Sequence, residues 1–262
     1  MPVDTSPGAT AVAHARRLAK GVPLDRTLRV TLHFHPDLPF AGSSTLQAIA
    51  DRGAYLSQFE TQTGNGGLTA HPGGDKWNWE SRIFGGAYDE HPPSQRPRYG
   101  SLNYRADPYG GSPRFGSSYF LLAEHTLDRT TFCFPDSVFE PELFGTADAM
   151  NLMEAAAAVE FDDPLDDYIE AHVHGTIDIA SDVEALVLDP SYRHTPFDEI
   201  ARRSPARYCG TTDTRWMSRR LRIIPTTGGR TSSTWPETSH TRASLPRPSS
   251  VVHGVSTSIR RT

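Results

Sequence analysis

Apolar and polar residues alternate most regularly in residues 167–190, DYIEAHVHGTIDIASDVEALVLDP. Successive side chains of a β-strand point to opposite faces, so the first half predicts a strand with one apolar and one polar face. The polar row is Tyr168, Glu170, His172 and His174. After Gly175, the run Val183–Leu188 predicts a second strand. One carboxylate and two imidazoles on a single strand face are an unusual concentration of acid–base groups.

A second alternation lies near the N-terminus, in residues 28–35, LRVTLHFH. It predicts a strand that carries His33 and His35 on its polar face. Further strands are predicted at residues 54–59, 99–104, 114–122 and 130–134, and helices at 9–20, 43–50 and 146–159, from their capping and terminating residues. Short strands and few helices predict an α+β fold, with small mixed or antiparallel sheets around a cleft, and not a doubly wound sheet.

Residues 61–86, TQTGNGGLTAHPGGDKWNWESRIFGG, show no sustained period. A loop of this length in a compact domain is often functional, so we expect a lid or a binding loop here. Within it, Trp77 and Trp79 are expected to anchor the loop to the core.

Composition divides the chain of 262 residues into two parts. Residues 1–200 predict a single catalytic-type domain, whereas residues 201–262 are basic, rich in Ser, Thr, Arg and Pro, and predict a disordered tail. The tail holds twelve arginines and two acidic residues, a net charge of +10, so residues 1–200 carry −15 of the total of −5. An acidic body argues against nucleic-acid binding across a broad basic surface.

The remaining composition predicts where the protein works. No apolar run approaches the roughly 18 residues of a membrane span, so no membrane partner is expected. The N-terminus lacks the apolar region of a secretory signal, which predicts a cytoplasmic protein and leaves delivery by a specialised secretion route open. The two cysteines, Cys133 and Cys209, form no CxxC pair, so a reduced compartment is expected.

The two His-x-His runs offer one reading of the chemistry. If their strands were adjacent, His33, His35, His172 and His174 would lie close to Glu170, and neutral histidines with a carboxylate can bind zinc. This set predicts a metal-dependent hydrolase as an alternative function. The sequence contains no HExxH or CxxC motif that would support it further.

The chain resembles a family of uncharacterised bacterial proteins, domain of unknown function 3626. The resemblance covers roughly residues 28–195 and lies in the segments TLHFHPD, GAYLSQFE, GNGGLTAHPGGDKWNWESRIFGG, RYGSLNYR, SPRFGSSYF and YIEAHVHG–DVEALVLDPS. It names a family and not an activity.

The order of these elements is more distantly similar to that of the ADP-ribosyltransferase superfamily. In that superfamily an early strand supplies a His or Arg that binds the nicotinamide ribose of NAD, a middle region supplies Tyr or Ser/Thr, and a late strand supplies the catalytic Glu. The resemblance assigns these roles to His33, with His35 as the alternate, to Tyr55 and Ser57, and to Glu170. Glu184 is a rival for the last role.

Other residues complete the expected NAD site. The Gly-rich segment around Gly66 and Gly67 can pass close to the pyrophosphate, and Arg114 can bind a phosphate or form a salt bridge. The resemblance thus implies an ADP-ribosyltransferase-like fold and NAD-dependent ADP-ribosyl transfer to a protein or nucleic acid, or NAD hydrolysis, as a bacterial toxin. A domain that binds a ligand without catalysis is the third possibility.

Overall fold

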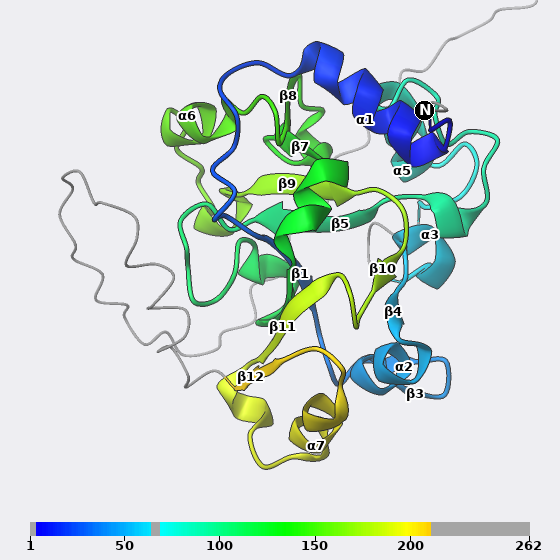
Figure 1. Cartoon of the computed structure of the whole chain (residues 1–262), viewed down its shortest axis with the longest axis vertical. Helices are drawn as coiled ribbons and strands as arrows, with labels where there is room; N and C mark the ends of the chain where they lie inside the picture. The colour runs from blue at the N-terminus through cyan, green and yellow to red at the C-terminus, as the bar shows by residue number, and fades with distance from the viewer. Residues whose placement is uncertain (1–3, 64–68, 211–262) are drawn as a thin grey trace, which may run out of the picture. The chain divides into compact units, whose positions relative to one another are not determined.

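Eight strands form the main sheet, in the spatial order β12-β11-β6-β1-β5-β9-β7-β8 (Figure 1). Neighbouring strands are antiparallel, except that β11 and β12 are parallel. The strands are β1 (Val30–Phe34), β5 (Arg98–Leu102), β6 (Ser118–Leu122), β7 (Thr130–Phe134), β8 (Leu143–Thr146), β9 (Ile169–Val173), β11 (Val183–Leu188) and β12 (Tyr208–Gly210). The predicted α+β class with a mixed sheet is confirmed.

Short elements surround this sheet. Two small sheets pair β2 (Pro39–Phe40) with β3 (Ser43–Ser44) and β4 (Ala54–Tyr55) with β10 (Ile177–Asp178). The α-helices are α1 (Pro7–Leu18), α2 (Thr45–Arg52), α3 (Gln58–Thr61), α5 (Asp75–Ile83), α6 (Leu152–Ala157) and α7 (Pro196–Arg203). The 3₁₀ turns are η1 (Pro93–Gln95), η2 (Pro113–Phe115), η3 (Glu124–Arg129), η4 (Ser137–Phe139), η5 (Pro164–Asp166) and η6 (Pro190–Tyr192).

The structure, a computed structural model, describes residues 4–63 and 69–210. They belong to the first of two units, Met1–Ile224, and the second unit, Pro225–Thr262, lies outside the described residues. The predicted boundary after residue 200 falls inside α7, because the helix continues to Arg203 and the chain then adds β12 to the sheet. Among the described residues, no helix combines the length and the apolar character that crossing a bilayer requires.

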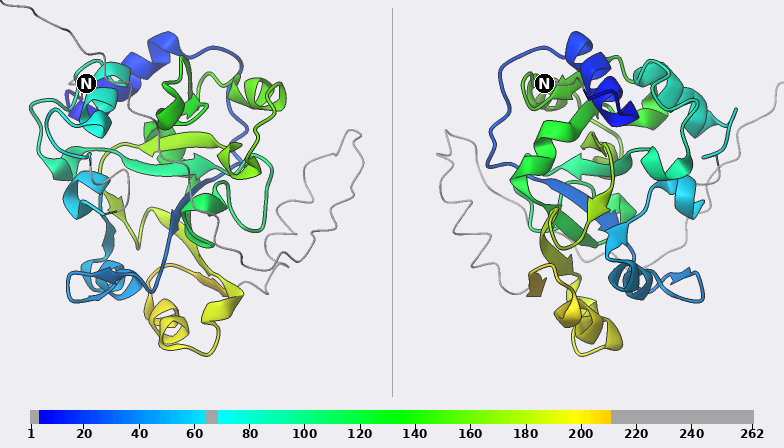
Figure 2. Two further views of the ribbon diagram at one scale, coloured as in Figure 1. Left: turned by 180° about the vertical axis from the view of Figure 1, so that it is seen from behind. Right: turned by 45° about the vertical axis from the view of Figure 1, so that its right-hand side comes forward.

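Strand register divides the sheet into two faces. Val30 lies opposite Leu102, and Leu32 lies opposite Phe120, so these side chains share one face, which we call the apolar face. Leu46 of α2, Leu152 of α6 and Ile200 of α7, among others, join the same hydrophobic cluster. Helices α2 and α7 lie side by side near β11 and β12 (Figures 1 and 2).

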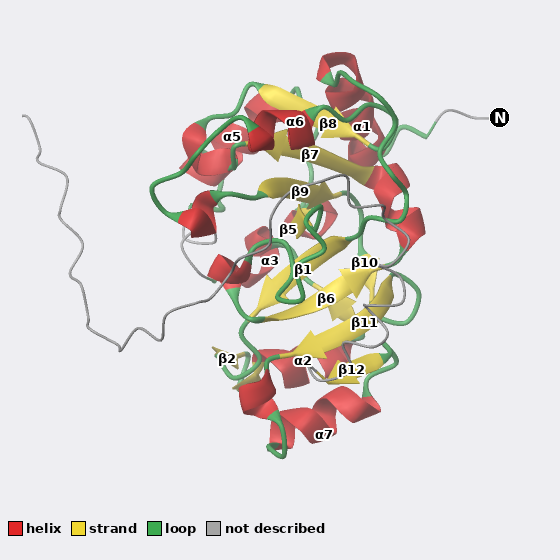
Figure 3. Cartoon of the chain, turned by 90° about the vertical axis from the view of Figure 1, so that its left-hand side faces the viewer, coloured by secondary structure: helices red, strands yellow, loops and turns green. Residues whose placement is uncertain are grey.

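The opposite face, which we call the polar face, carries the titratable groups of the alternating strands. Its row across the sheet includes Thr31, Ser101, Glu170 and Cys133, which are consecutive register partners in β1, β5, β9 and β7. Helices α1 and α5 cover this face, since Ala11, Trp79 and Cys133 belong to one cluster. Figure 3 shows both helices near the end of the sheet formed by β7 and β8.

Helix α5 corrects the prediction of a long loop over residues 61–86. Nine of these residues form a helix that begins after Gly74 and buries Trp79, Glu80 and Ile83 against the sheet. The sequence hid this helix, because its buried face includes a charged residue, Glu80. Residues 64–68 of the same segment lie outside the described residues.

Two other element predictions change in detail. The predicted strand 54–59 ends at Tyr55 and is followed by α3, whose capping box uses Ser57 and Glu60. The predicted helix 146–159 shrinks to α6, because Thr146 pairs with Thr131 in the sheet. The two strands of residues 167–190 are not neighbours, since β6, β1 and β5 lie between β11 and β9.

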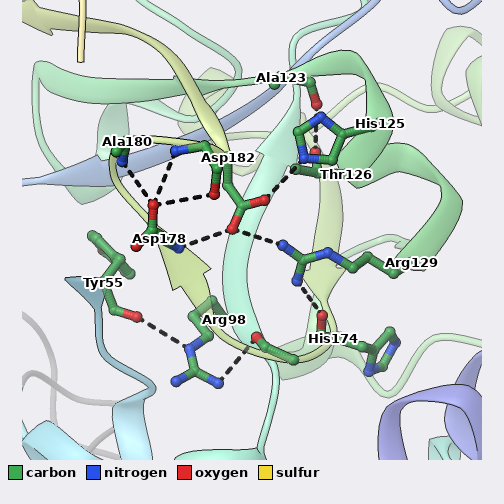
Figure 4. Close-up of polar contacts among 12 residues, drawn as sticks. Tyr55, Arg98, Ala123, His125, Thr126, Arg129, His174, Asp178, Ala180 and Asp182 are labelled. Carbon is green, nitrogen blue, oxygen red and sulfur yellow. Dashed lines mark hydrogen bonds and ion pairs between the residues drawn. The ribbon is translucent and has the colours of Figure 1, made fainter. Parts of the chain in front are cut away.

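A buried arginine ties the main sheet to the short strands beside it. Arg98 donates from Nε to the carbonyl of Tyr55, at 3.1 Å, and from Nη1 to the carbonyl of Gly175, at 3.2 Å (Figure 4). Its Nη2 also pairs with Glu60 at 3.1 Å. Nearby, Arg129 donates to the carbonyl of His174 and pairs with Asp182, which fixes the turn after β9 (Figure 4).

Two glycines with positive φ differ in how closely other atoms approach them. At Gly116, φ is +130°, and an added Cβ would press into the carbonyl of Phe34, whereas at Gly42, φ is +82° and nothing lies within 4 Å. We predict that Gly116→Ala lowers the free energy of unfolding by roughly 3 kcal/mol or more, from strain and overpacking together. Gly42→Ala should cost only about 1 kcal/mol, from strain alone. Urea unfolding of both variants checks this, and equal losses would contradict the packing at Gly116.

Candidate functional site

The strand register brings titratable and hydroxyl side chains together on the polar face. Glu170 of β9 lies between Ser101 of β5 and Cys133 of β7, and His172 lies one pleat further along β9, between Tyr99 and Thr131. Glu170 is 6% exposed, and His172 and Cys133 are fully buried. The alternation that the sequence shows is therefore the direct cause of the cluster.

Glu170 is held as an anion. His172 donates from Nε2 to Oε1 of Glu170 at 3.0 Å, and Ser137 donates from Oγ to Oε2 at 3.2 Å. Burial alone raises the pKa of the Glu170 carboxyl, but the His172 hydrogen bond, the charge of Lys76 and the Ser137 hydrogen bond outweigh it and hold the pKa below its usual value. A buried carboxylate on the polar face is thus ionised.

A row of hydrogen bonds continues from His172 to Tyr88. His172 Nδ1 lies 3.1 Å from Oγ1 of Thr131, which lies 2.9 Å from Nε2 of His174, and His174 Nδ1 lies 2.7 Å from the hydroxyl of Tyr88. Burial lowers the pKa of both histidines, despite the opposing charge of Glu170 at His172, so the rings are neutral.

The ionised Glu170 fixes the direction of this row. Because a carboxylate only accepts, Nε2 of His172 must donate to it, and Nδ1 then accepts the hydroxyl proton of Thr131. The Thr131 oxygen accepts from His174, which in turn accepts from Tyr88. Every donor therefore points toward Glu170.

Helix α5 places two charged side chains over the cluster. The half-buried Lys76 holds its ammonium 3.1 Å from the centroid of the Tyr99 ring, and Glu80 accepts from the Tyr99 hydroxyl at 2.8 Å. Burial lowers the pKa of Lys76, and Glu170 and Glu80 oppose that change. Arg96 neutralises Glu80 through a fully buried ion pair of 2.7 Å.

Cys133, Glu170 and His172 also form a set of metal-binding donor types. Their ligand atoms lie within 4.8 Å of one another, with Sγ 3.9 Å from Oε1 of Glu170 and 3.8 Å from Nε2 of His172. Burial, reinforced by the charge of Glu170, raises the pKa of the Cys133 thiol well above its usual value. Without a metal, Cys133 is therefore a neutral thiol and a poor nucleophile.

His33, expected to bind a ribose, is engaged in structural hydrogen bonds. Its Nδ1 donates to the carbonyl of Gly116 at 2.6 Å, and its Nε2 accepts from the amide of Ser112 at 3.2 Å. Nε2 also lies 3.1 Å from Oγ1 of Thr31 in the same strand. Burial lowers the pKa of His33 to about 4, although the bond to Gly116 opposes the change. Its ring faces the same side of the sheet as Glu170, with strand β5 between them.

The predicted four-histidine metal set is not assembled. The hypothesis required adjacent strands, but β5 separates β1 from β9. His35 follows the end of β1 and is exposed, and both ring nitrogens of His33 are occupied. Only His172 and His174 of the set lie together.

Tyr55 and Ser57 lie away from Glu170. The Tyr55 ring packs edge-on against Phe120 at 6.0 Å, on the apolar face, and its hydroxyl donates to the carbonyl of His33 at 3.2 Å. Burial raises the pKa of Tyr55 to about 12. Ser57 caps α3 and donates to the carbonyl of Pro93 at 2.8 Å, so both residues have structural contacts.

Two of the remaining predicted residues, Arg114 and Glu184, form ion pairs. Arg114 pairs with Asp163 at 2.5 Å and Asp166 at 2.9 Å, as the salt-bridge alternative expected. Glu184 accepts from Arg29 at 2.8 Å. Gly66 and Gly67 lie outside the described residues.

Sequence reasoning did not assign to the site the residues that other elements bring toward Glu170. These are Lys76, Glu80, Tyr99, Cys133 and Ser137. Two signals were present. Tyr99 and Ser101 occupy alternate positions in RYGSL, as Thr31 and His33 do in their strand. The spacing of Lys76, Trp79, Glu80 and Ile83 is that of one helical face.

A pocket of about 530 Å³ lies beside His174 of the hydrogen-bonded row. Residues at the N-terminus of α1, such as Gly8, line it together with Arg129 of η3 and His174. Figure 4 shows the side chains of Arg129 and His174 on either side of the carbonyl that joins them. Glu170 itself does not line this pocket.

A comparison with known families now places the chain. The sequence model of a family described as Protein of unknown function (DUF3626) matches residues 29–162 and 157–211. The chain belongs to the DUF3626 family. A search of the curated proteins found no match. The DUF3626 match includes Lys76, Cys133, Glu170 and His172, so the cluster lies within the family's shared region.

Burial of His33 predicts a pH dependence of stability. Its pKa is about 4 in the folded protein and 6.5 in the unfolded chain, so below pH 6.5 the unfolded state binds a proton that the folded state does not. The free energy of unfolding should therefore fall as the pH falls from 6.5 to 4, by up to about 3 kcal/mol from this residue.

Chemical unfolding of the wild type and of His33→Asn, measured across this range, isolates the effect. The variant cannot titrate, so its curve should be flatter than that of the wild type. Because His172 and His174 also contribute, only the difference between the curves belongs to His33. Parallel curves would contradict the assignment.

Proposed function

We propose that this protein cleaves the bond between nicotinamide and ribose in NAD, and transfers the ADP-ribosyl group to a macromolecule or to water. The observation that carries the proposal is the ionised, buried Glu170 on the polar face. Cleavage of this bond develops positive charge on the ribose, and a carboxylate held beside it stabilises that oxocarbenium-like state.

The arrangement of the strands supports the proposal. From the ADP-ribosyltransferase resemblance we expect the early strand with His, the middle element and the late strand with Glu to lie next to one another. Strands β1, β5 and β9 are consecutive in the sheet, and His33, Ser101 and Glu170 share its polar face. Tyr99 and Ser101 thus take the middle role that the sequence assigned to Tyr55 and Ser57.

Two groups of α5 add contacts that a nucleotide can use. Trp79 is 7% exposed and packs against the His172 ring at 5.3 Å, and its Nε1 has no hydrogen-bond partner among the described residues. A buried donor without a partner costs free energy, so a ligand acceptor that pairs with it gains affinity. Lys76 supplies a cation beside the same ring system and can bind a phosphate oxygen.

Access to Glu170 sets a requirement on the mechanism. Because the carboxylate is 6% exposed, a substrate reaches it only when a side chain around it moves. Lys76 is the natural candidate, since it is half-buried and has a flexible four-carbon stem. In this proposal the lysine leaves the Tyr99 ring to contact the substrate, and His33 orients β1 through its backbone and loop contacts.

Release of nicotinamide from NAD tests the proposal. We predict that the purified wild type releases nicotinamide and that Glu170→Gln lowers the rate by roughly 100- to 1,000-fold, because the amide keeps the shape but loses the charge. The reaction is followed by chromatography of nicotinamide and ADP-ribose, with and without added macromolecular acceptors.

Glu184→Gln is the matched control. Glu184 was the rival in the sequence, and its carboxylate is already paired with Arg29. This variant should keep its rate once its folding is confirmed by circular dichroism. A wild type that releases no nicotinamide under any of these conditions, or equal rates for Glu170→Gln and the wild type, would refute the proposal.

A further inference from the structure

We propose that Cys133, Glu170 and His172 bind one divalent zinc-class ion, and that this ion inhibits the protein by holding Glu170. The metal site stands on its own geometry, and only the inhibition rests on the proposed NAD cleavage. The ion takes sulfur from Cys133, oxygen from Glu170 and nitrogen from His172, a mixed donor set that suits zinc.

The spacing of the donor atoms is close to that of a metal site. With metal–ligand distances of about 2.0–2.3 Å in a tetrahedron, two ligand atoms lie roughly 3.4–3.6 Å apart. The three donors are separated by 3.9, 3.8 and 3.0 Å, so shifts of about half an ångström complete the geometry. The register supplies this triangle, since Cys133 is paired directly with Glu170.

Groups behind the three ligands already orient them. Thr131 lies opposite His172 in the register and contacts its Nδ1 at 3.1 Å, and Ser137 contacts the second oxygen of Glu170 at 3.2 Å. Metal-binding histidines usually make such a hydrogen bond with the nitrogen that faces away from the ion. The candidate site therefore has ligands and their supporting contacts.

Protons can rearrange so that every ring nitrogen of His172 and His174 keeps a partner. To bind the ion, Nε2 of His172 must give up its proton, and the ring keeps one proton on Nδ1. Nδ1 then donates to Thr131, whose hydroxyl turns to donate to His174, and His174 donates to the Tyr88 oxygen. Each imidazole keeps one proton, and the Cys133 thiol releases its proton to solvent.

Lys76 and the ion compete for the same negative charge. Without metal, the charge of the lysine helps to hold Glu170 as an anion and lowers the pKa of its carboxyl. An ion with two positive charges balances the thiolate and the carboxylate, so the ammonium is then surplus and repelled. Removal of the lysine charge should therefore tighten metal binding.

Cobalt titration of the full-length chain tests the site directly. After treatment with a chelator, the protein is titrated with Co²⁺, which reports sulfur ligation by an intense charge-transfer band in the near ultraviolet. We expect one equivalent to bind with this band and to release about one proton, because the thiol must ionise. Zn²⁺ should displace the cobalt.

The variants separate the two cysteines. Cys133→Ser and Cys133→Ala should lose the band, whereas Cys209→Ser, which alters β12, should keep it. Lys76→Met should tighten cobalt binding by roughly tenfold or more, since one repelling charge is removed. Thermal unfolding shows that each variant is folded. Absence of the band in the folded wild type, or its persistence in both Cys133 variants, would overturn the metal site.

The inhibition is then tested by nicotinamide release, with each variant compared with its own metal-free rate. One equivalent of Zn²⁺ should stop the wild type and Cys209→Ser and should leave both Cys133 variants uninhibited. A cobalt band that needs Cys133, together with a rate that zinc does not change, would overturn the inhibition. If no form releases nicotinamide, the proposed NAD cleavage fails, while the cobalt spectrum still decides the metal site.

Discussion

Two carboxylates lie in the interior between α5 and the sheet, and neutralising them is the constraint on which this layer depends. Glu80 is fully buried and is paired with Arg96, and Glu170 is held by His172, Ser137 and the charge of Lys76. A buried carboxylate that lost its partner would destabilise the fold by several kcal/mol. The position of α5, which carries both Lys76 and Glu80, is therefore fixed by charge as well as by the packing of Trp79.

The same constraint explains why the cluster is both structural and reactive. His172, which helps to keep Glu170 ionised, has a defined place in the sheet, because Tyr99 and Thr131 are its register neighbours and Cys133 is that of Glu170. A substrate or an ion that binds here must replace a contact that now stabilises the fold. Binding and local stability are thus expected to be coupled at this site.

The sequence predicted what depends on alternation within a strand and failed where contacts come from distant segments. The strands at Thr130–Phe134 and Val183–Leu188 and the shared face of Glu170 and His172 follow from a period of two. Alternation within a strand does not show which strands are its neighbours. The sequence therefore allowed β1 and β9 to be adjacent, although β5 separates them. Lys76 was overlooked for a related reason: its helix buries a glutamate, and the charge that permits this, Arg96, lies outside it.

The row from Tyr88 to Glu170 has a consequence for how the sheet can vary. Thr131 is a buried residue of β7, where its size alone would allow Val, which is common in strands. Its hydroxyl, however, is the only atom of that side chain that can both accept from one imidazole and donate to the other. A change to Val would leave one nitrogen of each of two buried imidazole rings without its hydrogen-bond partner, while Ser would preserve both bonds. During evolution this buried position should therefore accept Thr or Ser but not Val. The hydroxyl group, and not the volume of the side chain, determines which residues are tolerated.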